Sequence, residues 1–195
     1  MRLTGTYTAA VSGNATPVPF EADYVFPDQF LLSQGASGSQ ARDIISENQG
    51  WRVTPQGTTK LTAGLIAAVR YRAQELLPVK YQTPTAPRKV AGVERIDGKS
   101  YVVVEWHSPA GIGKLFFEEG SGLLYKFRAE IPSPLGTRVE ERTFEDYRTV
   151  NNNVKLAFLV TEHYMEEQSV YKVMDAQANV TFDPTRFTPD NPAQR

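Results

Sequence analysis

The stretch LTAGLIAAVRYRAQELL, residues 61–77, decides the fold class of this 195-residue chain. Along one side of it, at helical spacing, stand Leu61, Leu65, Val69, Arg72 and Leu76. This spacing predicts one helix over residues 61–77, and Pro78 ends the pattern. The rest of the chain alternates apolar and polar residues in short runs separated by Gly, Pro, Asn and Asp, which is typical of antiparallel strands.

The ratio of strands to helix predicts a curved sheet. A flat sheet of about ten strands, spaced about 4.8 Å apart, would be about 50 Å wide, whereas one helix is only about 10 Å across. Since a flat sheet would leave most of its apolar face in water, we expect the sheet to curl around the helix. The sequence therefore predicts a mainly β (α+β) fold, and a curled sheet with one helix tends to enclose an apolar cavity.

The composition excludes several classes of function. Lys plus Arg number 21 and Asp plus Glu number 22, with no block of like charge, so nucleic acid is not an expected partner. The absence of cysteine rules out disulfides, thiolate nucleophiles and thiolate-bound metals. No apolar run approaches the roughly 18 residues of a transmembrane segment. Met1 leads directly into a strand pattern without a signal-peptide core, so we expect either a cytoplasmic protein or one whose targeting segment is absent here.

Several turns and hairpins carry a family resemblance. They are residues 25–30 (VFPDQF), 50–51 (GW), 96–99 (IDGK), 115–125 (LFFEEGSGLLY) and 146–158 (DYRTVNNNVKLAF). Together they resemble the lipoprotein-carrier superfamily, the LolA/LolB-like or outer membrane lipoprotein-sorting protein domains. The resemblance implies an unclosed antiparallel β-barrel wrapped around a helical lid, located in the periplasm and holding acyl chains or another lipophile.

The resemblance also sets the expected domain organisation. It covers about residues 1–185, which we interpret as a single LolA-like half-barrel domain, and residues 186–195 are expected to form a polar C-terminal tail. The proline-rich stretch 78–87 is interpreted as an ordered crossover between two parts of that domain rather than as a linker between domains.

The polar residues do not form a recognisable catalytic or metal-binding pattern. His107 falls on the strand face opposite Trp106, which is typical of a surface histidine. The adjacent acids Glu140 and Glu141 point to opposite faces of a strand, so they cannot act as a dyad, and we interpret them as solvated. Asp146 and Arg148 share a strand face and are expected to pair at its rim. The sequence thus predicts no enzyme, no cofactor and no metal.

The candidate binding residues are the apolar and aromatic positions of the predicted inner face, with one arginine on the helix. They are Leu65, Val69, Leu76, Arg72, Phe20, Tyr24, Trp106, Phe117, Tyr125, Phe127 and Phe158. Arg72 either lays its stem along apolar surface or meets a carboxylate or phosphate headgroup. The same residues could equally form a filled core. The small side chains of Ala63, Gly64, Ala67 and Ala68 favour a cavity.

This pattern and what the family resemblance implies lead to two candidate functions. The first is a periplasmic, non-enzymatic carrier or binding domain for a lipophilic ligand, such as acyl chains, a lipid or a lipoprotein. The alternative is a structural or interaction domain of a larger multidomain envelope protein, with a filled core and with other domains of that protein as partners.

Overall fold

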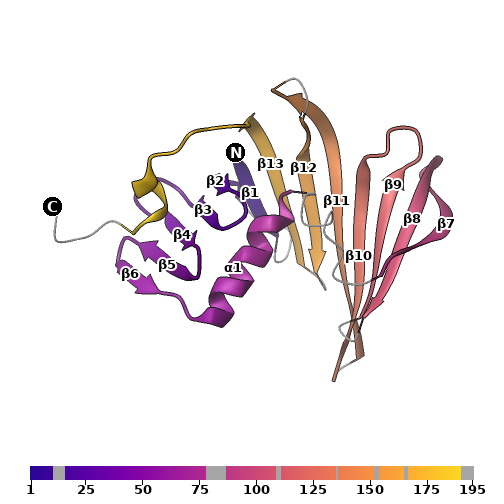
Figure 1. The fold of residues 1–195 in the computed structure, drawn as a ribbon, viewed down its shortest axis with the longest axis horizontal. Coiled ribbons are helices and arrows are strands. Elements are labelled where there is room, and N and C mark those ends of the chain that lie inside the picture. The colour runs from indigo at the N-terminus through magenta and orange to yellow at the C-terminus, as the bar shows by residue number, and fades with distance from the viewer. Residues whose placement is uncertain are drawn as a thin grey trace.

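The computed structural model describes residues 1–10, 16–77, 87–108, 111–134, 136–151, 154–164 and 167–189. These residues form one antiparallel sheet with a helix on one of its faces (Figure 1). The crossover expected at residues 78–87 falls almost entirely outside the described residues. The predicted mainly β fold with one main helix is confirmed.

The described part of the chain contains thirteen strands rather than about ten. The first six are β1 (Arg2–Ala10), β2 (Val18–Val25), β3 (Gln29–Gln34), β4 (Ala41–Ser46), β5 (Gln49–Thr54) and β6 (Gly57–Lys60). The other seven are β7 (Lys89–Ile96), β8 (Lys99–Ser108), β9 (Gly111–Glu118), β10 (Leu124–Ser133), β11 (Gly136–Val150), β12 (Val154–Tyr164) and β13 (Glu167–Gln177). The strand β6 was not predicted, because its four residues, GTTK, are all exposed and show no alternation of apolar and polar side chains.

The order of the strands is β6-β5-β4-β3-β2-β1-β13-β12-β11-β10-β9-β8-β7. Strands that follow one another in sequence therefore pair, with the exception of β6 and β7, and β1 also pairs with β13, which joins the two halves of the sheet. The two edge strands β6 and β7 are not neighbours in this order, so the barrel is unclosed, as the resemblance implied.

The helix α1 (Ala63–Glu75) is shorter than the predicted 61–77. Its first turn is capped by Thr62, whose Oγ1 accepts a hydrogen bond from the backbone N–H of Leu65 at 3.4 Å. The helix packs mainly on β3 and β4, and the hydroxyl of Tyr24 on β2 donates to the carbonyl of Ala73 at 2.9 Å. These contacts place α1 over the N-terminal half of the sheet.

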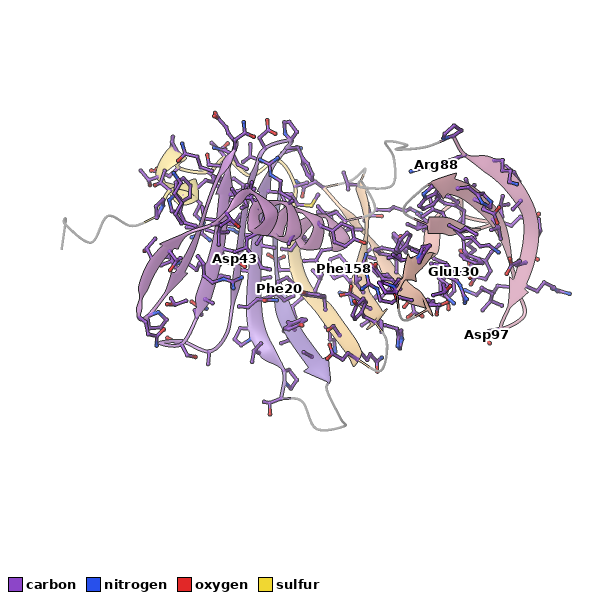
Figure 2. The ribbon with its side chains drawn as sticks, turned by 90° about the horizontal axis from the view of Figure 1, so that it is seen from below. Phe20, Asp43, Arg88, Asp97, Glu130 and Phe158 are labelled. Carbon is purple, nitrogen blue, oxygen red and sulfur yellow. The ribbon has the colours of Figure 1, made fainter. Side chains whose placement is uncertain are left out.

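The sheet face that carries α1, called the inner face below, holds the main hydrophobic core. Val69, Ala73, Leu76 and Leu77 of the helical segment pack there in one cluster with residues of both halves of the sheet. The strands β7–β10 continue the same sheet beyond the helix and curl tightly. In Figure 2 this curled part is the one that carries the labels Arg88 and Asp97, before and after β7. The inner face therefore extends well past the part that α1 covers.

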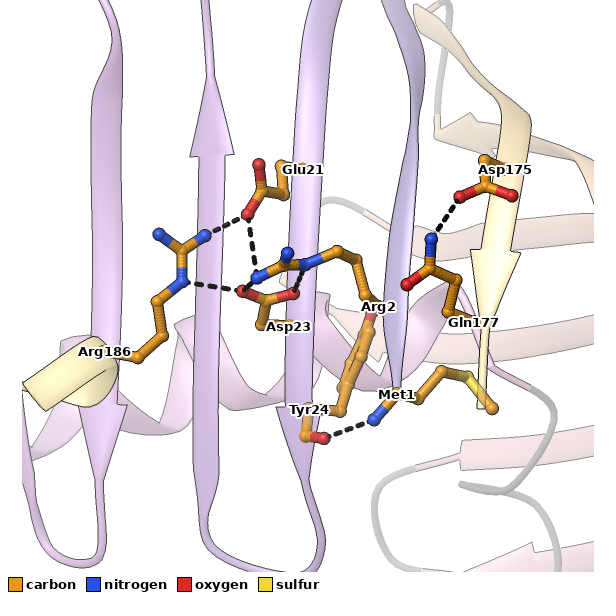
Figure 3. A network of polar contacts seen from close by, with 8 residues as sticks. All are labelled: Met1, Arg2, Glu21, Asp23, Tyr24, Asp175, Gln177 and Arg186. Carbon is orange, nitrogen blue, oxygen red and sulfur yellow. Dashed lines mark hydrogen bonds and ion pairs between the residues drawn. The ribbon is translucent and has the colours of Figure 1, made fainter. Parts of the chain in front are cut away.

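The opposite, outer face of β2–β4 carries a smaller core that the end of the chain covers. Phe187, in the 3-10 helix η2 (Pro184–Phe187), is buried against Leu31 and Ile44. Arg186 donates to the buried carboxylate of Asp23 at 2.8 Å, and also to Glu21 (Figure 3). Asp23 accepts from Arg2 as well, at 2.7 and 2.9 Å.

The tail predicted to start at residue 186 is therefore wrong at its boundary. Arg186 and Phe187 are packed on the domain because one supplies a counter-charge and the other an apolar ring to the outer face. The strand β13 ends at Gln177, and the chain then leaves the sheet to reach η2.

Candidate ligand-binding face

The inner face of β7–β10 presents apolar side chains that α1 does not cover. Strand alternation places Val104, Trp106 and Phe117 on this face, where they pack on the main core and stay partly accessible. Along the edge strand, Val90 pairs with Val104 and Val93 pairs with Val102, so both edge valines share the inner face. Val90 is 69% exposed and Val93 is 56% exposed.

Trp106 is the centre of this apolar surface. It lies opposite Gly113 on β9, where a Cβ atom would approach the indole to 2.0 Å, so the absence of a side chain lets the ring lie flat on the strand. The ring also stacks on Phe127, with centroids 6.2 Å apart and planes at 22°. The guanidinium of Arg88 sits 5.3 Å above the indole. Trp106 is thereby held in place while part of it remains accessible.

The hollow beside Trp106 is small. Its volume is about 150 Å³, and it is lined by residues that include Gly111, Ile112 and Ala129. Pockets for drug-sized ligands usually hold about 300–1,000 Å³. The apolar part of the inner face is therefore a partly accessible surface with a shallow hollow, and it adjoins the side chains of the main core.

A buried ionic cluster links α1 to β11 and β12, in the C-terminal half of the sheet. The side chain of Arg142 on β11 is 1% exposed and donates to Glu140 at 3.1 Å and to Glu162 at 2.6 Å. The hydroxyl of Tyr71, on α1, donates to the same Oε1 of Glu140 at 2.9 Å. Buried charges persist in proteins when they are paired and hydrogen-bonded, and this cluster meets both conditions.

The sequence interpretation missed this cluster. It placed Glu140 in solvent, whereas the structure buries that side chain. The available signal was the period of two in β11: Glu140, Arg142 and Phe144 point the same way, and Phe144 belongs to the main core. A run rich in charged residues suggests a solvated strand when the sequence is considered alone. The reason is that Glu162, which helps to neutralise the inward-facing Arg142, lies on a neighbouring strand and is far from Arg142 in sequence.

Next to this cluster a larger cavity opens between α1, β1, β12 and β13. Its volume is about 420 Å³, and four tyrosines and two glutamates account for most of its lining. These are Tyr7, Tyr71, Tyr164, Tyr171, Glu162 and Glu167. Ala68, which is exposed like Ala63, Gly64 and Ala67, lines the same cavity from the helix. Of the small helical residues that favoured a cavity, Ala68 thus borders one.

The structure distributes the predicted binding residues among different environments. Buried in the main core are Phe20, Tyr24, Val69, Leu76, Phe127 and Phe158, and partly buried there are Trp106 and Phe117. Leu65 is 52% exposed, so it does not share the buried side of α1 with Val69. The reason is that α1 contacts the sheet through a narrower stripe of apolar side chains than the helical spacing predicted. The side chain of Arg72 lies outside the described part.

Tyr125 does not belong to the inner face. It packs on the outer face against Tyr101, with ring centroids 4.7 Å apart. The pairing of β10 with β9 shifts register between Leu124 and Lys126, so one residue is inserted and the alternation is broken there. Leu124 and Phe127 both face the main core as a result, although they stand three positions apart.

The polar candidates behave as surface residues. His107 and His163 are exposed and lie on β8 and β12, and the Nε2 of His107 is 2.7 Å from Glu105. Arg148 pairs with Asp146 at 2.6 Å with both side chains about half exposed, which confirms the predicted rim pair. Among the described residues, no group of three His, Cys, Asp or Glu side chains could hold a metal ion. No described helix is long and apolar enough to cross a membrane.

Solved structures of other proteins with the same architecture superpose on nearly the whole chain. A DUF1329 family protein from Desulfovibrio piger superposes with a TM-score of 0.69 at 11% identity, covering 95% of this chain and 88% of that one. A LolA superfamily protein from Nitrosomonas europaea gives 0.64 at 12% identity, covering 97% and 90%. A putative outer membrane lipoprotein-sorting protein domain from Vibrio parahaemolyticus gives 0.62 at 9% identity, covering 96% and 89%.

No family model and no curated protein sequence matches the chain. The structural neighbours confirm the resemblance at the level of the fold: the chain is an unclosed antiparallel barrel around one helix, and that fold is LolA-like.

Proposed function

We propose that the protein is a periplasmic, non-enzymatic carrier or binding domain that takes a lipophilic ligand, such as acyl chains, on the inner face of β7–β10. The observation that carries this proposal is the accessibility of that face: Val90 and Val93 are mostly exposed, and Trp106 and Phe117 are only partly buried. Contiguous accessible apolar surface commonly marks a site of binding to an apolar partner. The LolA-like fold, shared with a lipoprotein-sorting domain, supports the same proposal.

The two tryptophans offer a direct test. Trp106 lies on the proposed surface, whereas Trp51 packs in the outer cluster with Leu31 and Ile44. In a Trp51→Phe variant, titration with dibrominated stearic acid should quench the fluorescence of Trp106 saturably, since bromine quenches on contact. In the matched Trp106→Phe variant, Trp51 should not be quenched. No quenching in either variant, or equal quenching in both, would contradict the proposal.

A matched pair of surface variants locates the site independently. Val90 on the inner face and Met174 on β13 are 69% and 68% exposed. Val90→Glu should weaken binding of the brominated acid about tenfold, because it removes apolar area and adds a like charge. Met174→Glu adds the same carboxylate in place of a similarly exposed apolar side chain, away from the inner face, and should leave the affinity unchanged. Equal effects would place the ligand elsewhere.

A second candidate function rests on the edge strand. Seven of the eight residues of β7, Lys89–Ile96, are exposed and the eighth is partly so, and no described strand pairs with its free edge. An open edge can accept a strand from another domain. The chain would then be a structural or interaction domain of a larger envelope protein, with a filled core. Expression together with the neighbouring domains, followed by hydrogen exchange of β7, distinguishes the two functions, since only docking protects the amides of β7.

A further inference from the structure

The cavity beneath the end of α1 has an unusual lining, and it is separate from the apolar surface at Trp106. In Figure 1 this end of the helix lies beside β12 and β13, and residues of these elements and of β1 line the cavity. The volume of about 420 Å³ is within the usual range for small-molecule sites. Four of the side chains that line it are tyrosines, which present phenol rings rather than aliphatic groups.

Neighbouring side chains hold two of these rings in place. Tyr7 and Tyr171 are cross-strand partners of β1 and β13, and their ring centroids are 4.6 Å apart at an angle of 37°. The hydroxyl of Tyr171 accepts a hydrogen bond from Gln34 at 3.3 Å, and the hydroxyl of Tyr7 is 3.3 Å from Ser169 Oγ. The aromatic wall is therefore pre-organised, so a ligand would lose little free energy to ordering it.

The charged side chains among the described residues that line the cavity are both carboxylates. Glu162 contributes a carboxylate that it shares with Arg142, and Glu167 contributes an exposed carboxylate for which the described residues provide no ion pair. No Lys or Arg is among the described residues that line the cavity. Arg142 is already bound by two glutamates, and Arg138 lies with its guanidinium 5.0 Å from the ring centroid of Tyr164. Among the described residues that line the cavity, a cation would meet ring faces and carboxylates.

We propose that this cavity binds an ammonium cation, and that a quaternary ammonium group such as trimethylammonium suits it best. Aromatic faces attract cations through the ring quadrupole, and weakly hydrated quaternary ammonium groups gain most from aromatic surroundings. Tyr164 already takes part in such a contact with Arg138. The inference goes beyond the proposed lipophile carrier, because it concerns a different part of the inner face and needs no acyl chain.

Titration of the full chain with choline and with dimethylbutanol separates charge from shape. Dimethylbutanol is the neutral isostere of choline, in which carbon replaces nitrogen. Chemical shifts of the backbone amides of Tyr7 and Tyr171 report binding. Choline should bind at least about tenfold more tightly than its isostere, as expected for a partly desolvated cation–π contact with an added carboxylate. Equal affinities, or no binding of choline, would overturn the proposal whether or not fatty acids bind at Trp106.

Variants of Tyr71 and Glu167 then locate the site. Tyr71 is 42% exposed, so the fold should tolerate its replacement. Tyr71→Phe and Tyr71→Leu both lose the hydrogen bond to Glu140, but only the second loses the ring. We expect Tyr71→Leu to weaken choline binding about three- to thirtyfold relative to Tyr71→Phe. Glu167→Gln should weaken choline but not dimethylbutanol, and Glu119→Gln, at an exposed hairpin tip, should change neither. Indistinguishable Phe and Leu variants, or an inert Glu167→Gln, would overturn the proposal.

Discussion

Asp23 shows how a single carboxylate connects distant parts of the chain. It is completely buried on β2, and it accepts hydrogen bonds from Arg2 on β1 and from Arg186 in η2 (Figure 3). Burial opposes ionisation of Asp23, but the hydrogen bonds from Arg2 and Arg186 outweigh it, so the pKa of this carboxyl is lowered. The ionised form therefore stabilises the folded state above the unfolded-state pKa, about 3.9, and that contribution is lost as the pH falls through the folded-state pKa.

Asp23→Asn removes this charge while keeping the shape of the side chain. We expect the free energy of unfolding at neutral pH to fall by about 1.5–3 kcal/mol, the usual worth of hydrogen bonds to a charged group. The variant should also lose less stability than the parent on acidification below about pH 4. Urea unfolding across a pH series measures both effects. Asp97→Asn, in an exposed turn where Asn tolerates the positive φ of 48°, is the control, and equal pH profiles for parent and Asp23→Asn would contradict this account.

At the scale of the element, α1 has two apolar sides with different surroundings. Val69, Ala73 and Leu76 are buried on the sheet, whereas Leu65 and Tyr71 are about half exposed. The helix is fixed to its neighbours by side chain to backbone contacts, such as the bond from Tyr24 to the carbonyl of Ala73 and a bond from Arg70 to the carbonyl of Glu47. It is thus an integral part of the core along one side only.

Two leucine truncations on α1 should therefore differ sharply. Leu76→Ala should reduce the free energy of unfolding by about 2–5 kcal/mol, because a buried leucine leaves a cavity. Leu65→Ala should change it by less than about 1 kcal/mol, because the side chain is mostly in solvent. Chemical denaturation of the two variants under identical conditions measures the difference. A large loss in Leu65→Ala would mean that this side chain packs against something the described residues do not include.

For the whole molecule, the pairing of β1 with β13 joins the first and last strands and holds the two halves of the sheet together. Gly5 occupies that joint, at a register shift between Thr4 and Gly5. A Cβ atom at this position would lie 2.0 Å from the carbonyl oxygen of Lys172 and 2.9 Å from the ring of Phe20. Only glycine lets the two strands and the aromatic ring approach so closely.

Gly5→Ala should consequently loosen the joint. We expect a loss of about 1–3 kcal/mol in the free energy of unfolding, as for an overpacked core, and faster hydrogen exchange in β1 and β13 than in β8 and β9. Gly120→Ala adds the same methyl group at a hairpin tip where nothing lies within 4 Å of it, and should be close to neutral. Equal protection of all four strands in the Gly5 variant would show that the joint is not a weak point.

The sequence by itself determined the elements that depend on neighbouring residues. The alternation of apolar residues specified most strands, the spacing over residues 61–77 specified the helix, and Asp97-Gly98 specified a tight turn in which both residues have positive φ. Only the tertiary structure decided on which face of the sheet Tyr125 lies, which residues neutralise Arg142 and how far toward the C-terminus the chain packs on the domain. These depend on a register shift in β10, on Glu162 twenty residues away and on Phe187 reaching β3 and β4, and contacts between distant segments leave no periodic signal in a single sequence.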